Sequence, residues 1–262
     1  MPATVVVTMA IVFGLMHISH VSAQSNPNFE VATIRPSKPD AQGKGFGARG
    51  RQFKTFNTSL ADLISYAYGC HPKQLIGAPD WVNTEKYDIT AQTDGEVPAG
   101  RQQLKVLWQN LIAQRFKLAF HHDKKELSVY VLRVAKTGPK LTKSEGDPNG
   151  LPTQGFRQFG ALKVQNATMG EFANQILQNT VLDRPVVDQT GLAGRWDFAL
   201  NWTPDDSQFA SLGAKMPPSS DAADAPPNLF TAIQEQIGLK LESGRALTDV
   251  LVIDNVERPT DN

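Results

Sequence analysis

Cys70 and His71 are neighbours whose side chains could together perform nucleophilic catalysis. A histidine that accepts the proton of a thiol makes that thiol a strong nucleophile. The two groups must face each other, however, and in enzymes they usually come from distant segments of the chain. We therefore interpret Cys70 as a free thiol in a loop and predict no catalytic residue.

The segment His121–Asp123, with Glu126 close behind it, contains residue types that bind metal ions. Successive side chains of a strand point to opposite faces, so the two histidines cannot easily bind one ion together. Three further acids match no spacing of a calcium loop; they are Asp183, Asp188 and Asp197. The His-Glu-x-x-His, Gly-x-Ser-x-Gly and phosphate-loop motifs do not occur in the sequence. We expect neither a metal nor a cofactor.

Polar residues and glycines are concentrated in the stretch 183–200, DRPVVDQTGLAGRWDFAL. This composition is typical of a binding loop, and equally of a turn between two strands. Aromatic side chains elsewhere could add a stacking surface, although a place in the core also suits them. The candidate binding residues are Arg184, Asp188, Arg195, Trp81 and Trp196.

The elements that must position these residues occur twice along the chain. Residues 53–68 align without a gap on residues 162–177, and the same shift places 87–92 on 196–201. Self-similarity of this kind indicates repeated structural units. We expect an α+β fold of two tandem similar units, each with two helices packed on a small mixed or antiparallel sheet.

Each predicted unit has recognisable helix starts and a closing hairpin. Capping boxes begin the first helices, at Ser59–Asp62 and at Thr168–Glu171. The second helices are expected at 101–115 and after Asn228, whose side chain is a suitable cap. Alternating apolar and polar residues at the end of each unit predict a hairpin. The expected turns are Asp123–Lys125 and Ser243–Arg245.

Composition sets the expected boundaries of the two units. The first unit covers 24–136 and the second covers 155–262, with the polar segment 137–154 as a linker rich in glycine and proline. Within the second unit, residues 203–227 are rich in Pro, Ala, Ser and Asp. We expect that segment to be a mobile insertion.

The N-terminus is typical of a secretory signal. The apolar run 3–16 is too short for a comfortable membrane span, and Val21–Ala23 has the small-x-small pattern of a cleavage site. We predict a signal peptide at 1–23, cut after Ala23. The product would be a periplasmic or secreted protein with no stable membrane span. The alternative is an N-terminal anchor that is not cleaved.

The bulk composition is that of a globular protein, since 40% of the 262 residues are hydrophobic and 20% are charged. Lys plus Arg and Asp plus Glu balance at 26 each. We therefore expect no nucleic-acid partner and no adsorption to an anionic membrane. The single cysteine allows no internal disulfide.

Several segments together resemble a family of exported bacterial proteins. They are FEVATIRPS (29–37), GAPDW (77–81), YDITA (87–91), RFKLAFH (115–121), GPKL (138–141), RPVVDQTGLAGRWDF (184–198) and IDNVERPTDN (253–262). The chain is similar to the soil-associated family, a domain of unknown function that is abundant in acidobacteria. Related domains are fused, in some proteins, behind membrane metallopeptidases of the beta-lactam-sensor type. The resemblance therefore implies an extracytoplasmic sensing or binding role.

A weaker likeness concerns the small domains at the N-termini of secretins and TonB-dependent receptors. It is carried by SLADLI (59–64) and by LKVLWQNLIAQRFKLAF (104–120). Those domains are periplasmic interaction modules, and the likeness is one of fold alone.

We expect a non-enzymatic binding or interaction module of the cell envelope. Its partner would be an envelope protein, a peptide or a glycan. The alternative is an envelope hydrolase that gathers histidine, aspartate or cysteine residues from distant segments into one site.

Overall fold

The computed structural model describes residues 28–93, 101–214 and 225–260. The predicted signal peptide 1–23 and its cleavage after Ala23 lie outside these described residues. Across the described ranges, no helix is both long and apolar enough to cross a membrane.

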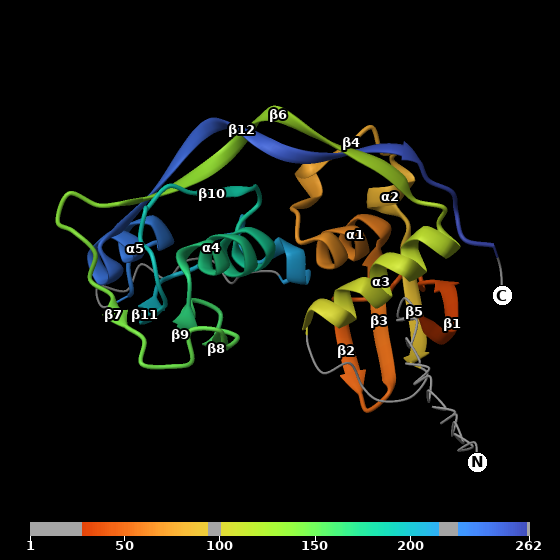
Figure 1. The fold of residues 1–262 in the computed structure, drawn as a ribbon, viewed down its shortest axis with the longest axis horizontal. Helices are drawn as coiled ribbons and strands as arrows, with labels where there is room; N and C mark the ends of the chain where they lie inside the picture. Colours follow the sequence, from red (N-terminus) through yellow and green to blue (C-terminus); the bar gives the residue numbers. More distant parts are fainter. Residues whose placement is uncertain (1–27, 94–100, 215–224, 261–262) are drawn as a thin grey trace, which may run out of the picture.

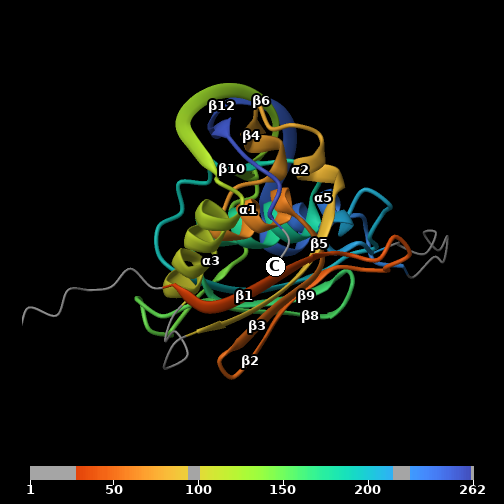
Figure 2. The same ribbon diagram turned by 90° about the vertical axis from the view of Figure 1, so that its right-hand side faces the viewer.

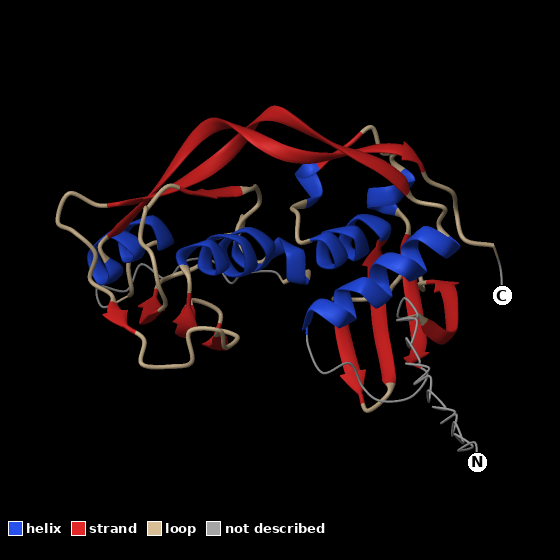
Figure 3. Ribbon diagram, viewed as in Figure 1, coloured by secondary structure: helices blue, strands red, loops and turns tan. Residues whose placement is uncertain are grey.

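The chain is a mixed α+β structure arranged in three layers (Figure 1). Two four-stranded sheets form the bottom layer, helices form the middle layer, and strands of a third four-stranded sheet cross the top (Figure 3). The view from the side gives the same order of layers (Figure 2). The helices are therefore sandwiched between strands.

The strands have a simple order in each sheet. Sheet 1 has the order β1 (Phe29–Pro36), β5 (Lys86–Thr93), β3 (Gln52–Ser59) and β2 (Gly45–Arg49). Sheet 2 has the order β7 (Thr142–Lys143), β11 (Trp196–Asn201), β9 (Ala161–Ala167) and β8 (Thr153–Gln158). The top sheet has the order β10 (Val186–Asp188), β6 (Ala119–Val134), β12 (Leu239–Asn255) and β4 (Leu75–Ile76). Its central strands, β6 and β12, form a long two-stranded ribbon.

The helices lie along the middle layer and divide between the two bottom sheets. Those above sheet 1 are α1 (Leu60–Tyr68), α2 (Trp81–Thr84) and α3 (Arg101–Arg115), with the short turn η1 (Pro72–Gln74) beside them. Those above sheet 2 are α4 (Met169–Glu171), the π-helix η2 (Phe172–Val181) that continues it, and α5 (Leu229–Ile237). The short helix η3 (Ala210–Leu212) contacts η2.

Two separate hydrophobic cores define a first lobe, built on sheet 1, and a second lobe, built on sheet 2. Each lobe also takes apolar side chains from the ribbon. Leu251, near the end of β12, is part of the first core, whereas Leu132, near the end of β6, is part of the second. Both side chains are buried, at 4% and 0% exposure.

The two predicted closing hairpins are wrong. The segments Asp123–Lys125 and Ser243–Arg245 are not turns but lie inside the continuous strands β6 and β12. These strands pair with each other in antiparallel fashion, from Leu239 opposite Val134 to Asn255 opposite Ala119. Alternation along a segment shows only that it is a strand, so it cannot tell a hairpin from a long strand with a distant partner.

The predicted helix starts are confirmed. Ser59 accepts a hydrogen bond from the backbone N–H of Asp62 at 3.1 Å, and the Asp62 carboxylate accepts from the N–H of Ser59 at 2.9 Å. Thr168 and Glu171 form the same pair of bonds, at 3.1 and 2.9 Å. The helix at 101–115 and the cap at Asn228 also lie where they were predicted.

An asparagine in a left-handed conformation precedes each capping box. Asn57 has a φ of 50° and Asn166 a φ of 56°. The N–H of Asn57 donates to Asp88, and that of Asn166 to Asp197, both at 2.8 Å. Each side-chain amide then donates to carbonyls of a loop that passes over it, 41–43 in the first lobe and 147 in the second. This arrangement fastens one loop to each bottom sheet.

The expected linker and insertion contain ordered contacts. Within the linker 137–154, β7 pairs with β11 through Lys143 opposite Trp196. Of the expected insertion 203–227, residues 215–224 lie outside the described part. In its described part, Phe209 is completely buried and Gln208 accepts a hydrogen bond from the Trp202 indole at 2.7 Å.

Replacing Asn57 tests the left-handed position. Asn57→Ala should lower the free energy of unfolding by about 1–3 kcal/mol, because alanine is strained at positive φ and forms no side-chain hydrogen bonds. The loss of unfolding free energy in Asn57→Gly should be smaller by about 1 kcal/mol, because glycine adopts this conformation freely. Urea unfolding followed by circular dichroism measures both. Equal losses in the two variants would contradict the strain argument.

Candidate functional site

The outer face of sheet 2 contains a hollow of about 640 Å³. Along β9 and β11, Leu162, Val164 and Leu200 point inward and are buried. The residues between them therefore point outward, because side chains alternate along a strand. Besides Leu162 and Leu200, whose side chains point into the core, the residues that line the hollow are Arg157, Gln158, Ala161, Lys163, Ala199, Asn201 and Gln236.

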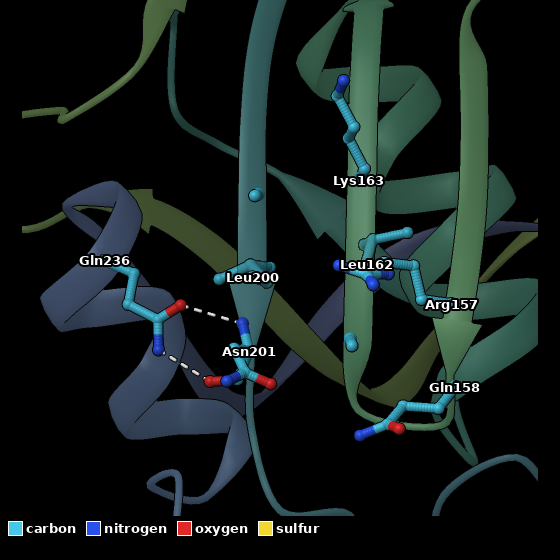
Figure 4. A pocket seen from close by; sticks show the side chains of 9 residues that line it. Arg157, Gln158, Leu162, Lys163, Leu200, Asn201 and Gln236 are labelled. Carbon is cyan, nitrogen blue, oxygen red and sulfur yellow. Dashed lines mark hydrogen bonds between the residues drawn. The ribbon is translucent and has the colours of Figure 1, made fainter.

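Small side chains form the floor of this hollow and longer polar ones form its border. Ala161 lies opposite Asn201, and Lys163 lies opposite Ala199. Arg157 extends from β8 across β9 (Figure 4). Arg157 and Lys163 are the charged residues of the lining, and both are exposed. The hollow is therefore positively charged, with amide groups as further hydrogen-bonding partners.

Gln236 of α5 occupies the edge of β11 beside the hollow. Its amide oxygen accepts from the backbone N–H of Asn201 at 2.9 Å, and its amide nitrogen donates to the Asn201 carbonyl at 2.7 Å (Figure 4). These are the two bonds that another strand would make to this residue. The side chain of Gln236 thus covers the edge and leaves the face of the sheet open.

The side chains of the hollow are suited to ligand recognition. Its volume lies in the range of about 300–1,000 Å³ that is usual for ligand sites. The lining residues carry guanidinium, ammonium and amide groups, but no thiol, hydroxyl, imidazole or carboxylate. Cations and amides bind carboxylates strongly, through charge-assisted hydrogen bonds. The hollow suits an anionic ligand.

Arg184, a predicted binding residue, lies where the two lobes meet beneath the ribbon. Its guanidinium is 4.6 Å from the ring centre of Tyr130 and 3.2 Å from Asp183. Asp183 also pairs with Lys73 of the first lobe at 3.2 Å. Burial alone would raise the pKa of Asp183, but hydrogen bonds from Arg184 and Lys73 lower it below its usual value. Arg184 therefore belongs to a junction between the lobes.

Asp188 and Arg195 both support local structure. Asp188 accepts from the backbone N–H and the hydroxyl of Thr190, at 2.9 and 2.8 Å, in an exposed turn. Arg195 donates to the carbonyls of Pro148 and Asn166, at 2.7 and 2.5 Å. It also pairs with the capping-box acid Glu171 at 3.0 Å. Arg195 thus joins a loop, a strand end and a helix start.

The two candidate tryptophans lie in different lobes. Trp81 is half-buried in the first lobe, with the Arg258 guanidinium 5.0 Å from its ring centre. Arg258 forms a double ion pair with Glu85, beside a smaller hollow of about 370 Å³. Trp196 packs against the core of the second lobe. The contacts of the five predicted binding residues therefore do not come together in one place.

The environment of Cys70 and His71 opposes nucleophilic catalysis. Burial raises the pKa of the Cys70 thiol to about 12. Burial and the nearby Lys73 charge lower the pKa of His71 to about 4, and its Nδ1 already accepts the backbone N–H of Lys73 at 3.1 Å. At neutral pH the thiol is protonated and the imidazole nitrogen is occupied.

The histidines of β6 have separate partners. His121 Nδ1 lies 2.8 Å from Asp254, whereas the ring of His122 packs edge-on against Phe120. Within the described ranges, no three His, Cys, Asp or Glu residues form a group that could hold a metal ion.

Sequence reasoning missed the residues of the hollow. A usable signal was present, because the shift that aligns the two predicted units places Lys163 on Lys54. It also places Ala199 on Thr90 and Ala161 on Gln52, so two larger residues correspond to alanines. That these alanines leave a hollow on the face of the sheet became visible only with the strand register.

One comparison with known proteins identifies a relationship. A family model described as "Protein of unknown function (DUF3738)" matches residues 61–256, more than half of the 262 residues. No curated protein and no solved structure matches the chain.

Arg195 is expected to act on stability. Arg195→Ala should lower the free energy of unfolding by about 2–3 kcal/mol, because it leaves Glu171 and two carbonyls without their charged partner. Asp188→Asn keeps an acceptor in its exposed turn and should change stability by less than about 0.5 kcal/mol. Urea unfolding measures both variants, and an Arg195→Ala protein as stable as the parent would refute the structural role.

Cys70 should be unreactive in the folded protein. At pH 8, alkylation by iodoacetamide should be at least about 100-fold slower than in urea, because the thiolate is the reactive form and burial suppresses it. Mass spectrometry of the labelled chain measures the rate. Fast labelling of the native protein would show an activated thiol and would reopen the catalytic alternative.

Proposed function

The chain belongs to the DUF3738 family, whose function is unknown, and we propose that it is a non-enzymatic binding module of the cell envelope. In this proposal the hollow on the outer face of sheet 2 holds an acidic peptide segment of a partner. The partner belongs to the envelope, since the N-terminal sequence 1–23 has the pattern of a secretory signal. The family resemblance supports a sensory setting by association alone.

The two bottom sheets differ in the size of their outward side chains, and this difference carries the proposal. Lys54 lies opposite Thr90 in sheet 1, and Lys163 lies opposite Ala199 in sheet 2. Gln52 lies opposite Gln92 and Arg49, whereas Ala161 lies opposite Asn201 and Gln158. Both sheets therefore present cations on their outer faces, but larger side chains fill the positions that alanines occupy in sheet 2.

The alanines are not explained by the stability of the sheet. Alanine is disfavoured in strands relative to threonine, and an exposed alanine buries little surface. Sheet 1 shows that glutamine and threonine fit the same register. A binding function accounts for Ala161 and Ala199, because they make the room that a ligand needs.

The lining favours a peptide over a glycan. Arg157 and Lys163 can each pair with a carboxylate, and the amides of Gln158 and Asn201 can bond peptide groups. The lining contains no aromatic ring on which a sugar could stack. Since the whole chain is neutral, at 26 positive and 26 negative residues, the positive charge is a local property of this face.

Peptide binding measured by fluorescence anisotropy tests the proposal. The probe is a labelled hexaglutamate peptide, with neutral Gly-Ser and hexalysine peptides for comparison. We expect binding of hexaglutamate alone. The double variant Arg157→Ala with Lys163→Ala should weaken it at least about tenfold, since charge-assisted bonds contribute about 1.5–3 kcal/mol each.

Sheet 1 supplies matched controls for this experiment. Ala161→Gln with Ala199→Thr installs the residues of sheet 1, so the protein should fold normally but lose binding. Arg49→Ala with Lys54→Ala removes two cations from the outer face of sheet 1, of which Lys54 corresponds to Lys163, and should leave binding unchanged. Equal effects of the variants in both sheets, or no effect in either, would refute the proposed site.

A further inference from the structure

We propose that the two halves of the chain are binding partners that exchange strands, so that the protein is a covalently joined pair of two similar units. The core of each lobe is then incomplete by itself, and the similar unit in the other half of the same chain completes it. This inference is independent of the ligand proposed for sheet 2.

The ribbon strands each serve both lobes. The first part of β6 lies on the first lobe, where Phe120 packs against the core. Its last part enters the second lobe, where Tyr130 and Leu132 join the core. β12 runs in the opposite direction and brings Leu251 back into the core of the first lobe. Each core is thus completed by a strand from the other half of the sequence.

Both outer edges of the ribbon receive equivalent short strands. β4 pairs in parallel with β12 at Leu251 and Val252, and β10 pairs in parallel with β6 at Tyr130–Leu132. Each short strand comes from the lobe on which it packs. An antiparallel pair with equivalent additions on its two edges has the arrangement of a two-fold symmetric dimer.

Next to each short strand, a further side chain contacts the same ribbon strand. Next to β4, the Gln74 amide donates to the carbonyl of Asp249 in β12 at 2.8 Å. Next to β10, Arg184 lies 3.4 Å from the hydroxyl of Ser128 in β6. Within each lobe, the left-handed asparagine, its aspartate partner and the capping box recur in the same order. Independent local features therefore repeat together with the ribbon geometry.

Engineered disulfides in a chain that can be cut test the exchange. A protease site is inserted between Gly150 and the exposed Leu151, in the Cys70→Ser background. Glu126→Cys with Leu247→Cys joins facing positions of β6 and β12, and both side chains are exposed. Lys124→Cys with Asp249→Cys provides a second facing pair. His122→Cys with Glu126→Cys would join the arms of a local hairpin that turns at 123–125.

The expected results distinguish exchange from local closure. After cutting, the two fragments should elute together at the size of the uncut chain in native buffer. On a non-reducing denaturing gel, the ribbon disulfides should hold them together, and without engineered cysteines they should separate. Fragments that separate in native buffer would overturn the proposal. Formation of the 122–126 disulfide in place of both ribbon disulfides would overturn it as well.

Discussion

The pairing of β6 with β12 is the constraint on which both lobes depend. Neither lobe encloses its core with its own segment of the sequence, since Leu132 and Leu251 enter the core of the other half. A buried leucine contributes several kilocalories per mole to stability, about 2–5 when it is cut back to alanine. Loss of the ribbon register would therefore expose apolar surface in both lobes at once. This coupling explains how two small cores can form one folded protein.

Charge pairing fixes the helices to the loops that pass over the bottom sheets. Lys44 lies 2.6 Å from the capping-box acid Asp62, and Arg195 lies 3.0 Å from Glu171. Burial by itself would raise the pKa of Asp62, but the Lys44 charge and the hydrogen bonds of Ser59 outweigh it and lower the pKa. The acid stays ionised, so it can accept from the helix start and from the lysine together. A helix position is thus coupled to a loop position in each lobe.

Features that depend on residues a few positions apart were predicted, whereas contacts between distant segments were not. The capping boxes at Ser59 and Thr168 and the helix Arg101–Arg115 depend on residues a few positions apart, and all were predicted correctly. The hairpins were wrong because a strand's alternation carries no information about its partner. The contacts of Arg195 reach from Pro148 to Glu171, so its structural role was invisible without the fold. The π-winding of η2 left no signal in the apolar spacing.

The layer order explains why the candidate site lies on a sheet face. The helices and the ribbon cover one side of each bottom sheet, which leaves the outer faces free to differ without disturbing either core (Figure 2). Gln236 satisfies the backbone of Asn201 at the edge of β11, so the edge is protected against pairing with other chains. What distinguishes sheet 2 from sheet 1 is then the size of a few outward side chains. A hollow produced by two alanines can arise or disappear by substitution, whereas the ribbon that supports it cannot change without loss of the fold.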